Sequence, residues 1–309
     1  MTDPLTKTPA AGSASAAPDP TLDSPNRPAS GGVAGIALVL GGAFSVQFGS
    51  AVAALAFPLA GALGVVALRI SIAAVLLLAV CRPRLRDYSR ADLGVAAAFG
   101  LALGGMNVFF YLAIERIPMG LAVTLEVLGP LVLSVVIARR ALSLLWAGLA
   151  LAGVFLLGRG GLEEINLAGA AFALCAASMW AAYIVLSSKA GERFPRLDGL
   201  ALAMVVSMLV SLPLGIGSAG TALLDPVVLG LGAAVAILSS GLPYALELLA
   251  LRRLPKSTFS ILMSLAPAIA ALAGFLVLGQ TLTLLQCLAI GLVIVASAGA
   301  VRTGRAAKS

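Results

Sequence analysis

Long apolar stretches alternate with short polar segments between Val33 and Val301. Most of these stretches have about the length that a helix needs to cross a ~30 Å hydrocarbon core. The two-residue alternation of a membrane barrel is absent, so the pattern predicts helices. We predict ten spans, of which the fifth is the shortest, at 33–55, 62–81, 93–113, 119–138, 143–158, 167–188, 199–216, 227–251, 257–278 and 283–301.

The two ends of the chain differ from this pattern. Residues 1–32 contain six prolines and no aromatic residue, and they cannot bury enough apolar area to offset the entropy of ordering. They also lack the basic start and short apolar run of a signal peptide. We predict a disordered tail over 1–32 and a second short tail over 302–309.

Composition narrows the class of protein. Hydrophobic residues make up 61% of the chain and charged residues 11%, against about 45–50% and 25% in soluble domains. This excludes an ordinary soluble fold. The chain has no histidine and three widely spaced cysteines, so neither a metal site nor a disulfide framework is expected. No phosphate-binding loop is present either, and we expect no cofactor.

The net charge of +7 reflects where the basic residues lie. If both termini are cytoplasmic, 17 of the 20 lysines and arginines fall in the cytoplasmic segments. The outer loops then carry only Arg116 and Arg159, and Arg69 lies within a span. This asymmetry follows the positive-inside rule, and it explains the basic charge without a nucleic-acid partner.

The two halves of the chain resemble each other. Residues 112–118 match residues 249–255 at an offset of 137, and the same offset places Gly129-Pro130 on Ala266-Pro267. We predict two repeats, 33–160 and 161–301, with five spans each. Because five is odd, the repeats would have opposite orientations in the membrane, which is typical of transporters. A channel is also compatible with this pattern.

Three charged residues lie within predicted spans, namely Arg69, Glu126 and Glu247. Such residues are costly in a bilayer and often mark a functional site. Arg69 and Glu126 are each about seven residues from the outer end of a span, which places both roughly 10 Å deep. They could hold the carboxylate and the ammonium of a zwitterion. Alternatively, they could form a salt bridge that only fixes helix packing.

Glu247 lies close to the cytoplasmic end of its span. It could pair with Arg252 or Arg253, or it could carry a proton. Since the chain has no histidine, a carboxylate is the natural titrating group, so Glu126 and Glu247 are both candidates for proton coupling.

Uncharged polar residues in the spans outline a pathway through the membrane. Each could contact substrate or simply join helices by hydrogen bonds, and the two tyrosines could instead belong to an interfacial belt or a gate. The candidates for substrate binding are Gln47, Asn107, Tyr111, Trp180 and Tyr244. Pro130 and Pro267 lie in mid-span, where proline bends a helix and frees a carbonyl group; we predict kinks there.

Several of these motifs are similar to those of a known family. Residues 103–112, 118–126 and 129–131, supported by 45–47, 67–69 and 234–247, resemble the EamA group of the drug/metabolite transporter superfamily. Within this group the chain is most similar to bacterial exporters of threonine and homoserine. The similarity extends over about 45–300, and the positions of Arg69, Asn107, Glu126, Tyr244 and Glu247 are retained.

The resemblance implies an all-α protein with ten helices in two inverted EamA repeats, in the bacterial inner membrane with both termini cytoplasmic. It also implies antiport of small amino acids against protons. The chain departs from related proteins at Ala266 and Gln280, where they often carry glutamate.

Other functions stay open at this point. The chain could export drugs or other metabolites, or it could be a passive channel or a membrane scaffold without transport activity. The expected partners are a small amino acid, protons and the lipid bilayer. The oligomeric state is not predicted.

Overall fold

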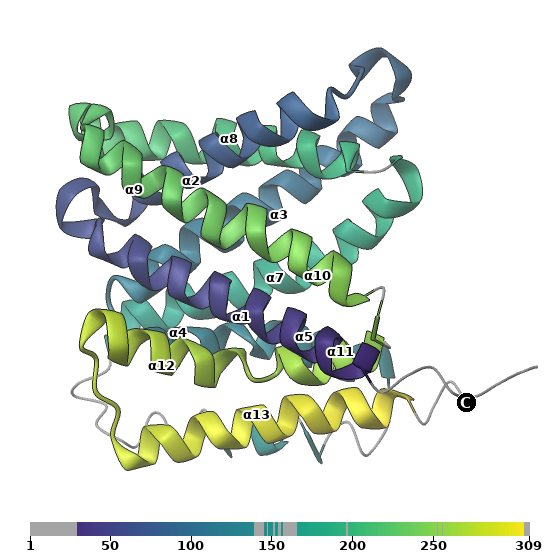
Figure 1. Ribbon diagram of the computed structural model, residues 1–309, viewed down its shortest axis with the longest axis vertical. Coiled ribbons are helices and arrows are strands. Elements are labelled where there is room, and N and C mark those ends of the chain that lie inside the picture. The colour runs from purple at the N-terminus through teal and green to yellow at the C-terminus, as the bar shows by residue number, and fades with distance from the viewer. Residues whose placement is uncertain are drawn as a thin grey trace, which may run out of the picture.

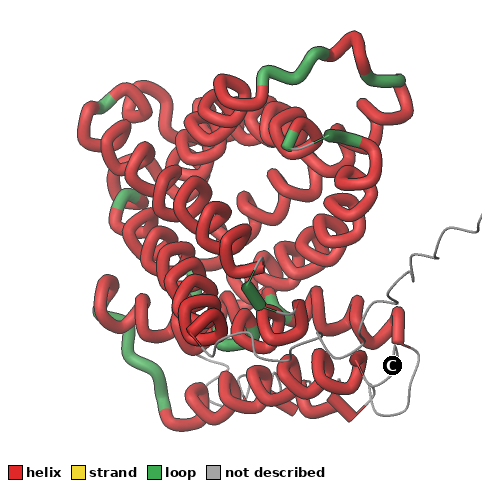
Figure 2. The backbone as a smooth tube through the Cα atoms, turned by 45° about the vertical axis from the view of Figure 1, so that its right-hand side comes forward, coloured by secondary structure: helices red, strands yellow, loops and turns green. Residues whose placement is uncertain are grey.

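The computed structural model describes residues 30–305 except 139–144, 147, 151, 154–155, 157–165, 196, 252 and 255. Within this part of the chain all regular structure is helical (Figures 1 and 2). The helices are α1 (Ser30–Leu55), α2 (Phe57–Cys81), α3 (Arg90–Ile114), α4 (Met119–Glu126), α5 (Leu128–Ala138), α7 (Leu167–Arg193), α8 (Asp198–Ala219), α9 (Pro226–Ala236), α10 (Leu242–Leu251), α11 (Lys256–Met263), α12 (Ala266–Leu278) and α13 (Leu284–Arg305).

Six described helical segments are long and apolar enough to cross a membrane. Shorter apolar helices occupy Met119–Leu133, Pro226–Ser239 and Leu284–Ala300. Half of the residues of the predicted fifth span, 143–158, lie outside the described part of the chain. The all-helical membrane class therefore agrees with the prediction, while the count of ten remains an expectation.

Several helices extend beyond their predicted boundaries. Helix α1 begins at Ser30, within the segment predicted to be disordered, and α13 continues to Arg305, past the predicted limit of 301. Helix α2 begins at Phe57 instead of 62, because Pro58 suits a first helical turn and Gly61 (φ 65°) allows a kink before the apolar run. Hydropathy marks only the hydrocarbon core, whereas a helix can continue into the interface.

Small residues bring four helices close together. Helix α3 packs against α7 and α8, and α2 packs against α8. Gly100 and Gly104 of α3 face Ala203 and Ser207 of α8, and the Ser207 hydroxyl donates a hydrogen bond to the Gly100 carbonyl at 2.7 Å. Such small-residue contacts are the usual means of tight helix packing in membranes. Helices α2, α3, α7 and α8 therefore form one tightly packed unit.

The helices on the other side of the molecule are interrupted. A turn at Val127 separates α4 from α5, and a turn at Ser264 and Leu265 separates α11 from α12. Pro130 lies three residues after Val127, and Pro267 lies three residues after Ser264. A π-helical segment, Ile237–Gly241, joins α9 to α10. Three irregularities of the backbone thus lie at mid-span, where a membrane protein tolerates them only if they are buried or line a cavity.

Candidate substrate cavity

A cavity of about 270 Å³ lies where the interrupted helices meet the tightly packed unit. Its lining comes from both halves of the chain, and Glu126, Ser239 and Ala266 belong to or adjoin the three irregular segments. Five of the residues predicted to bind substrate line it, namely Gln47, Arg69, Asn107, Glu126 and Trp180. Residues up to 133 positions apart in sequence are therefore brought to one site.

Arg69 is held from two sides. Its Nη1 donates to the Tyr111 hydroxyl at 3.1 Å, and its Nη2 donates to the Ser239 carbonyl at 3.3 Å. The guanidinium also lies 5.5 Å from the centre of the Tyr111 ring, within the range of a cation–π contact. A π-helical turn leaves backbone carbonyls open to other donors, and the Ser45 hydroxyl binds the neighbouring Leu238 carbonyl at 2.6 Å.

Glu126 is the last residue of α4 and lines the same cavity as Arg69. Among the described residues the two form no ion pair within 4.0 Å. Pro130 has no N–H group, so it cannot donate the usual helical hydrogen bond to the Glu126 carbonyl four residues earlier. The geometry thus does not match a salt bridge that serves only to fasten the helices.

Unsatisfied polar atoms also lie at the cavity. Gln47 and Asn107 are 7% and 8% exposed. The Asn107 amide donates to the Leu103 carbonyl at 2.9 Å. The Gln47 Oε1 and Ser239 Oγ atoms are buried without a hydrogen-bond partner among the described residues. Buried polar atoms are nearly always hydrogen-bonded, so these two can bind the polar groups of a ligand or water.

Three other predicted site residues are not among the described residues that line the cavity. Tyr111 is fully buried and is not among the described residues that line the cavity, so it supports Arg69 and is not part of an interfacial belt. Helix α10 carries Tyr244 and Glu247, but both side chains lie outside the described part of the structure. Their predicted roles remain predictions.

Ala266 and Gln280, the two residues that depart from the family pattern, have different surroundings. Ala266 lines the cavity. The Gln280 Oε1 atom instead accepts a hydrogen bond at 3.0 Å from the Met119 N–H group at the start of α4. Gln280 therefore caps a helix, which a glutamate could do as well. Of these two positions, only 266 changes the polarity of the cavity.

The cavity is also lined by residues that were not among the predicted substrate-binding residues. Met263 ends α11, and Ser239 lies in the π-helical segment. Ser239 was one polar residue among several, and nothing in its spacing predicts a π turn. Met263 gave no sequence signal, because an apolar residue in an apolar span is expected everywhere.

A separate polar cluster lies where α3 and α8 begin and α7 ends. The Tyr88 hydroxyl donates to Asp198 Oδ2 at 2.6 Å, and Arg193 pairs with Asp92 at 2.9 Å. The hydrogen bond to Asp198, with smaller contributions from burial and nearby carboxylates, raises the pKa of Tyr88 to about 12. The connection after α2 is thereby fastened to the start of α8, and the start of α3 to the end of α7.

These features together define a class of protein. A bundle of apolar helices, interrupted at mid-span around a cavity that holds an arginine and a glutamate, is typical of membrane transporters. The chain belongs to the EamA-like transporter family, whose model matches residues 167–302. This confirms the resemblance inferred from the motifs.

Curated relatives support this family assignment, and a solved structure has a similar fold. The threonine/homoserine exporter RhtA of Escherichia coli K12 is 42% identical over 273 residues, which are 87% of this chain and 92% of that protein. The protein of the same name from Salmonella typhimurium LT2 is 42% identical over 264 residues, or 84% and 89%. One solved crystal structure, 19% identical, covers 91% of this chain and 98% of its own with a TM-score of 0.55, which shows a shared fold. The chain is thus a multi-pass membrane transporter and not an enzyme.

Proposed function

We propose that the protein exports small amino acids such as threonine and homoserine, by alternating access and in exchange for protons. One observation carries this proposal: Arg69 and Glu126 line one cavity and form no ion pair with each other. An amino acid carries both an ammonium and a carboxylate, so a site of this kind needs both charges unpaired. The names of the relatives agree with this substrate class.

The side chains of the cavity then have distinct roles. Arg69 binds the substrate carboxylate, since a guanidinium can donate two parallel hydrogen bonds to it. Glu126 holds the ammonium group. Gln47 and Asn107 bind the hydroxyl group of the side chain, and Trp180 provides an apolar wall. Tyr111 keeps the guanidinium of Arg69 in position.

Proton exchange follows from the use of a single carboxylate. A proton and an ammonium group compete for Glu126, because protonation removes the charge that attracts the ammonium. If each crosses the membrane bound to Glu126, inward movement of protons drives outward movement of substrate. Glu247 is the alternative proton carrier, at the cytoplasmic end of its span.

The same proposal includes the predicted topology, with ten helices in two inverted repeats and both termini cytoplasmic in a bacterial inner membrane. The basic residues support this orientation. The breaks at Val127 and Ser264 are 137 positions apart, the offset of the sequence match. The family model also matches 167–302, close to the predicted second repeat. The start of α1 and the end of α13 lie at the same end of the molecule (Figure 1).

The experiment is efflux of labelled threonine and homoserine from proteoliposomes, with and without a pH gradient. The variants Arg69→Lys and Glu126→Gln should each lower the rate at least about tenfold, as expected when a charged buried partner is lost. The matched controls Arg86→Lys and Glu192→Gln change exposed residues outside the cavity and should transport normally.

The outcomes separate the possible functions. Gradient-accelerated efflux that is lost in Glu126→Gln supports proton exchange through this residue. Normal efflux in both cavity variants would overturn the proposed site. Export of cationic dyes without amino-acid flux would indicate a drug exporter, flux insensitive to the gradient a channel, and no flux of any compound a scaffold.

A further inference from the structure

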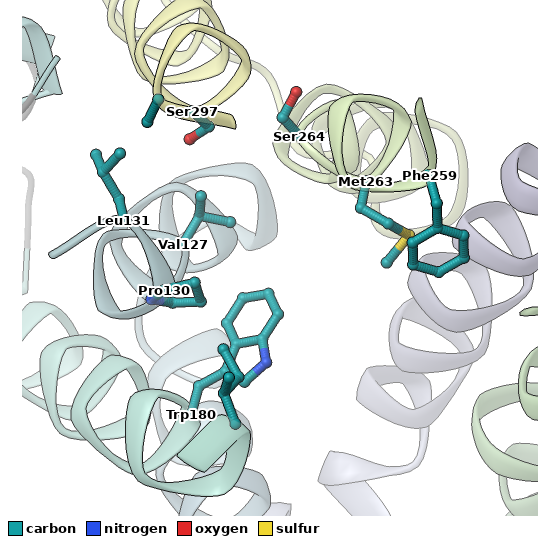
Figure 3. A pocket seen from close by; sticks show the side chains of 10 residues that line it. Val127, Pro130, Leu131, Trp180, Phe259, Met263, Ser264 and Ser297 are labelled. Atoms are coloured by element: carbon teal, nitrogen blue, oxygen red, sulfur yellow. The ribbon is translucent and has the colours of Figure 1, made fainter. Parts of the chain in front are cut away.

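A second cavity, of about 410 Å³, adjoins the first. It lies between α5, α7, α11 and α13, and its lining is mainly apolar (Figure 3). Neighbouring residues divide between the two spaces: Glu126 and Tyr183 line the polar cavity, whereas Val127 and Ile184 line the apolar one. The two cavities are therefore side by side.

Two side chains line both cavities, namely Trp180 and Met263. Figure 3 shows Trp180 projecting from α7 and Met263 from α11 into the space between these helices. Both residues are half-buried. They therefore form the partition between a polar space that holds the charged groups and a larger apolar space beside it.

We propose that Trp180 and Met263 determine substrate size, by closing the apolar cavity to the side chain of an amino acid bound at Arg69 and Glu126. This inference rests on the proposed function. With the partition in place, the polar cavity accepts short, hydroxyl-bearing side chains. Without it, the two spaces join, and an aliphatic side chain can extend among Val127, Ile184 and Phe259.

The apolar space has properties that suit such a side chain. Ser264 and Ser297 carry the only side-chain hydroxyl groups among the described residues that line it, and most of the other lining side chains are aliphatic or aromatic. An empty apolar cavity loses contacts with every missing atom, so filling it with methyl and methylene groups is favourable. The chemical class admitted is therefore an α-amino acid with a branched aliphatic side chain, such as leucine.

The test measures ligand binding and transport in partition variants. Met263→Ala and Trp180→Leu remove the two parts of the partition, and Ile184→Ala is the matched control because it enlarges only the apolar cavity. Binding is measured as the rise in unfolding temperature of purified protein when leucine or threonine is added. Transport is measured as efflux of labelled leucine and threonine from proteoliposomes.

We expect leucine to stabilise Met263→Ala and Trp180→Leu but neither the wild type nor Ile184→Ala. The ratio of leucine to threonine efflux should rise at least about tenfold, the usual effect of one methylene group in an apolar pocket. If both partition variants fold but gain no stabilisation by leucine, the partition does not set substrate size. Failure of the proposed function is distinguishable, since the wild type would then neither bind nor export threonine.

Discussion

The Tyr111 hydroxyl accepts a hydrogen bond from Nη1 of Arg69 at 3.1 Å, although Tyr111 itself is fully buried behind the cavity. The Ser239 carbonyl binds the other terminal nitrogen of the same guanidinium. The arginine is thus positioned by α3 and by the π-helical segment before any substrate arrives. Positioning of this kind reduces the entropy that binding must overcome.

Replacing Tyr111 with phenylalanine should weaken binding of the substrate carboxylate. The ring remains, but the acceptor for Arg69 is lost, and a hydrogen bond to a charged group contributes about 1.5–3 kcal/mol. We expect the KM for threonine efflux to rise about tenfold with little change in maximal rate. Tyr88→Phe removes a hydroxyl far from the cavity and is the control. An unchanged KM in Tyr111→Phe would mean that Arg69 needs no such support.

Alanine at Pro130 or Pro267 should slow transport without loss of stability. Alanine restores an N–H group that can bond to the carbonyl four residues earlier and so favours a straight helix across the break. A hydrogen bond of about 1 kcal/mol changes a population ratio about fivefold, and we expect efflux to fall by about that factor. The measurements are efflux rate and unfolding temperature in detergent.

Pro213 provides the control for this prediction. It lies inside α8, a helix that continues past it without a break and belongs to the tightly packed unit. Pro213→Ala should therefore leave the efflux rate unchanged. Equal slowing in all three variants would show that the breaks before Pro130 and Pro267 have no special role in the transport cycle.

The sequence predicted the site well where it depends on polar and charged side chains, which are costly to place in a membrane. Arg69, Glu126, Gln47 and Asn107 are conspicuous in apolar spans, and all four line the cavity. Hydropathy also predicted most helices within a few residues. Both inferences use the same physical fact, that polar groups are poorly solvated by lipid.

The sequence was less informative about backbone and apolar contacts. The π-helical segment contributes the Ser239 carbonyl to the site, but a backbone group has no signature in a sequence. Met263 lines two cavities, yet it is one apolar residue among many. The position of Tyr111 behind Arg69 depends on how α2 and α3 pack, which periodicity alone does not determine. The depth of a residue in the membrane could be predicted from the sequence. The rotation of each helix about its axis, which decides the neighbours that its residues contact, could not.

The hydrogen bond between Tyr88 and Asp198 should make stability depend on pH in the alkaline range. The pKa of Tyr88 is raised from 10.0 to about 12 in the folded protein, mainly by this bond. The hydrogen bond therefore stabilises the folded protein fully below pH 10, and this stabilisation is lost as the pH rises through about 12. We expect the wild type to unfold at a higher temperature than Tyr88→Phe at pH 8, with the difference vanishing towards pH 12.

A double-mutant cycle with Asp198→Ala tests the cause. If the bond is responsible, the second substitution should add little to Tyr88→Phe at pH 8, because the two residues lose the same interaction. Additive effects of the two substitutions at pH 8 would contradict this explanation, and a constant difference between wild type and Tyr88→Phe up to pH 12 would contradict the raised pKa.

Replacing Gly100 with alanine should lower the stability of the protein, whereas replacing Gly94 should raise it, although both glycines lie in α3. A Cβ atom on Gly100 would lie 2.6 Å from the Val206 Cβ and would overlap the Ala203 carbonyl, so α3 and α8 would have to separate. Overpacking of this kind costs about 1–3 kcal/mol. A Cβ on Gly94 meets nothing within 4 Å, and alanine there favours the helix by roughly 0.5–1 kcal/mol. Unfolding temperatures in detergent should fall for Gly100→Ala and rise for Gly94→Ala. Equal stabilisation by both would show that α3 and α8 do not need this close contact.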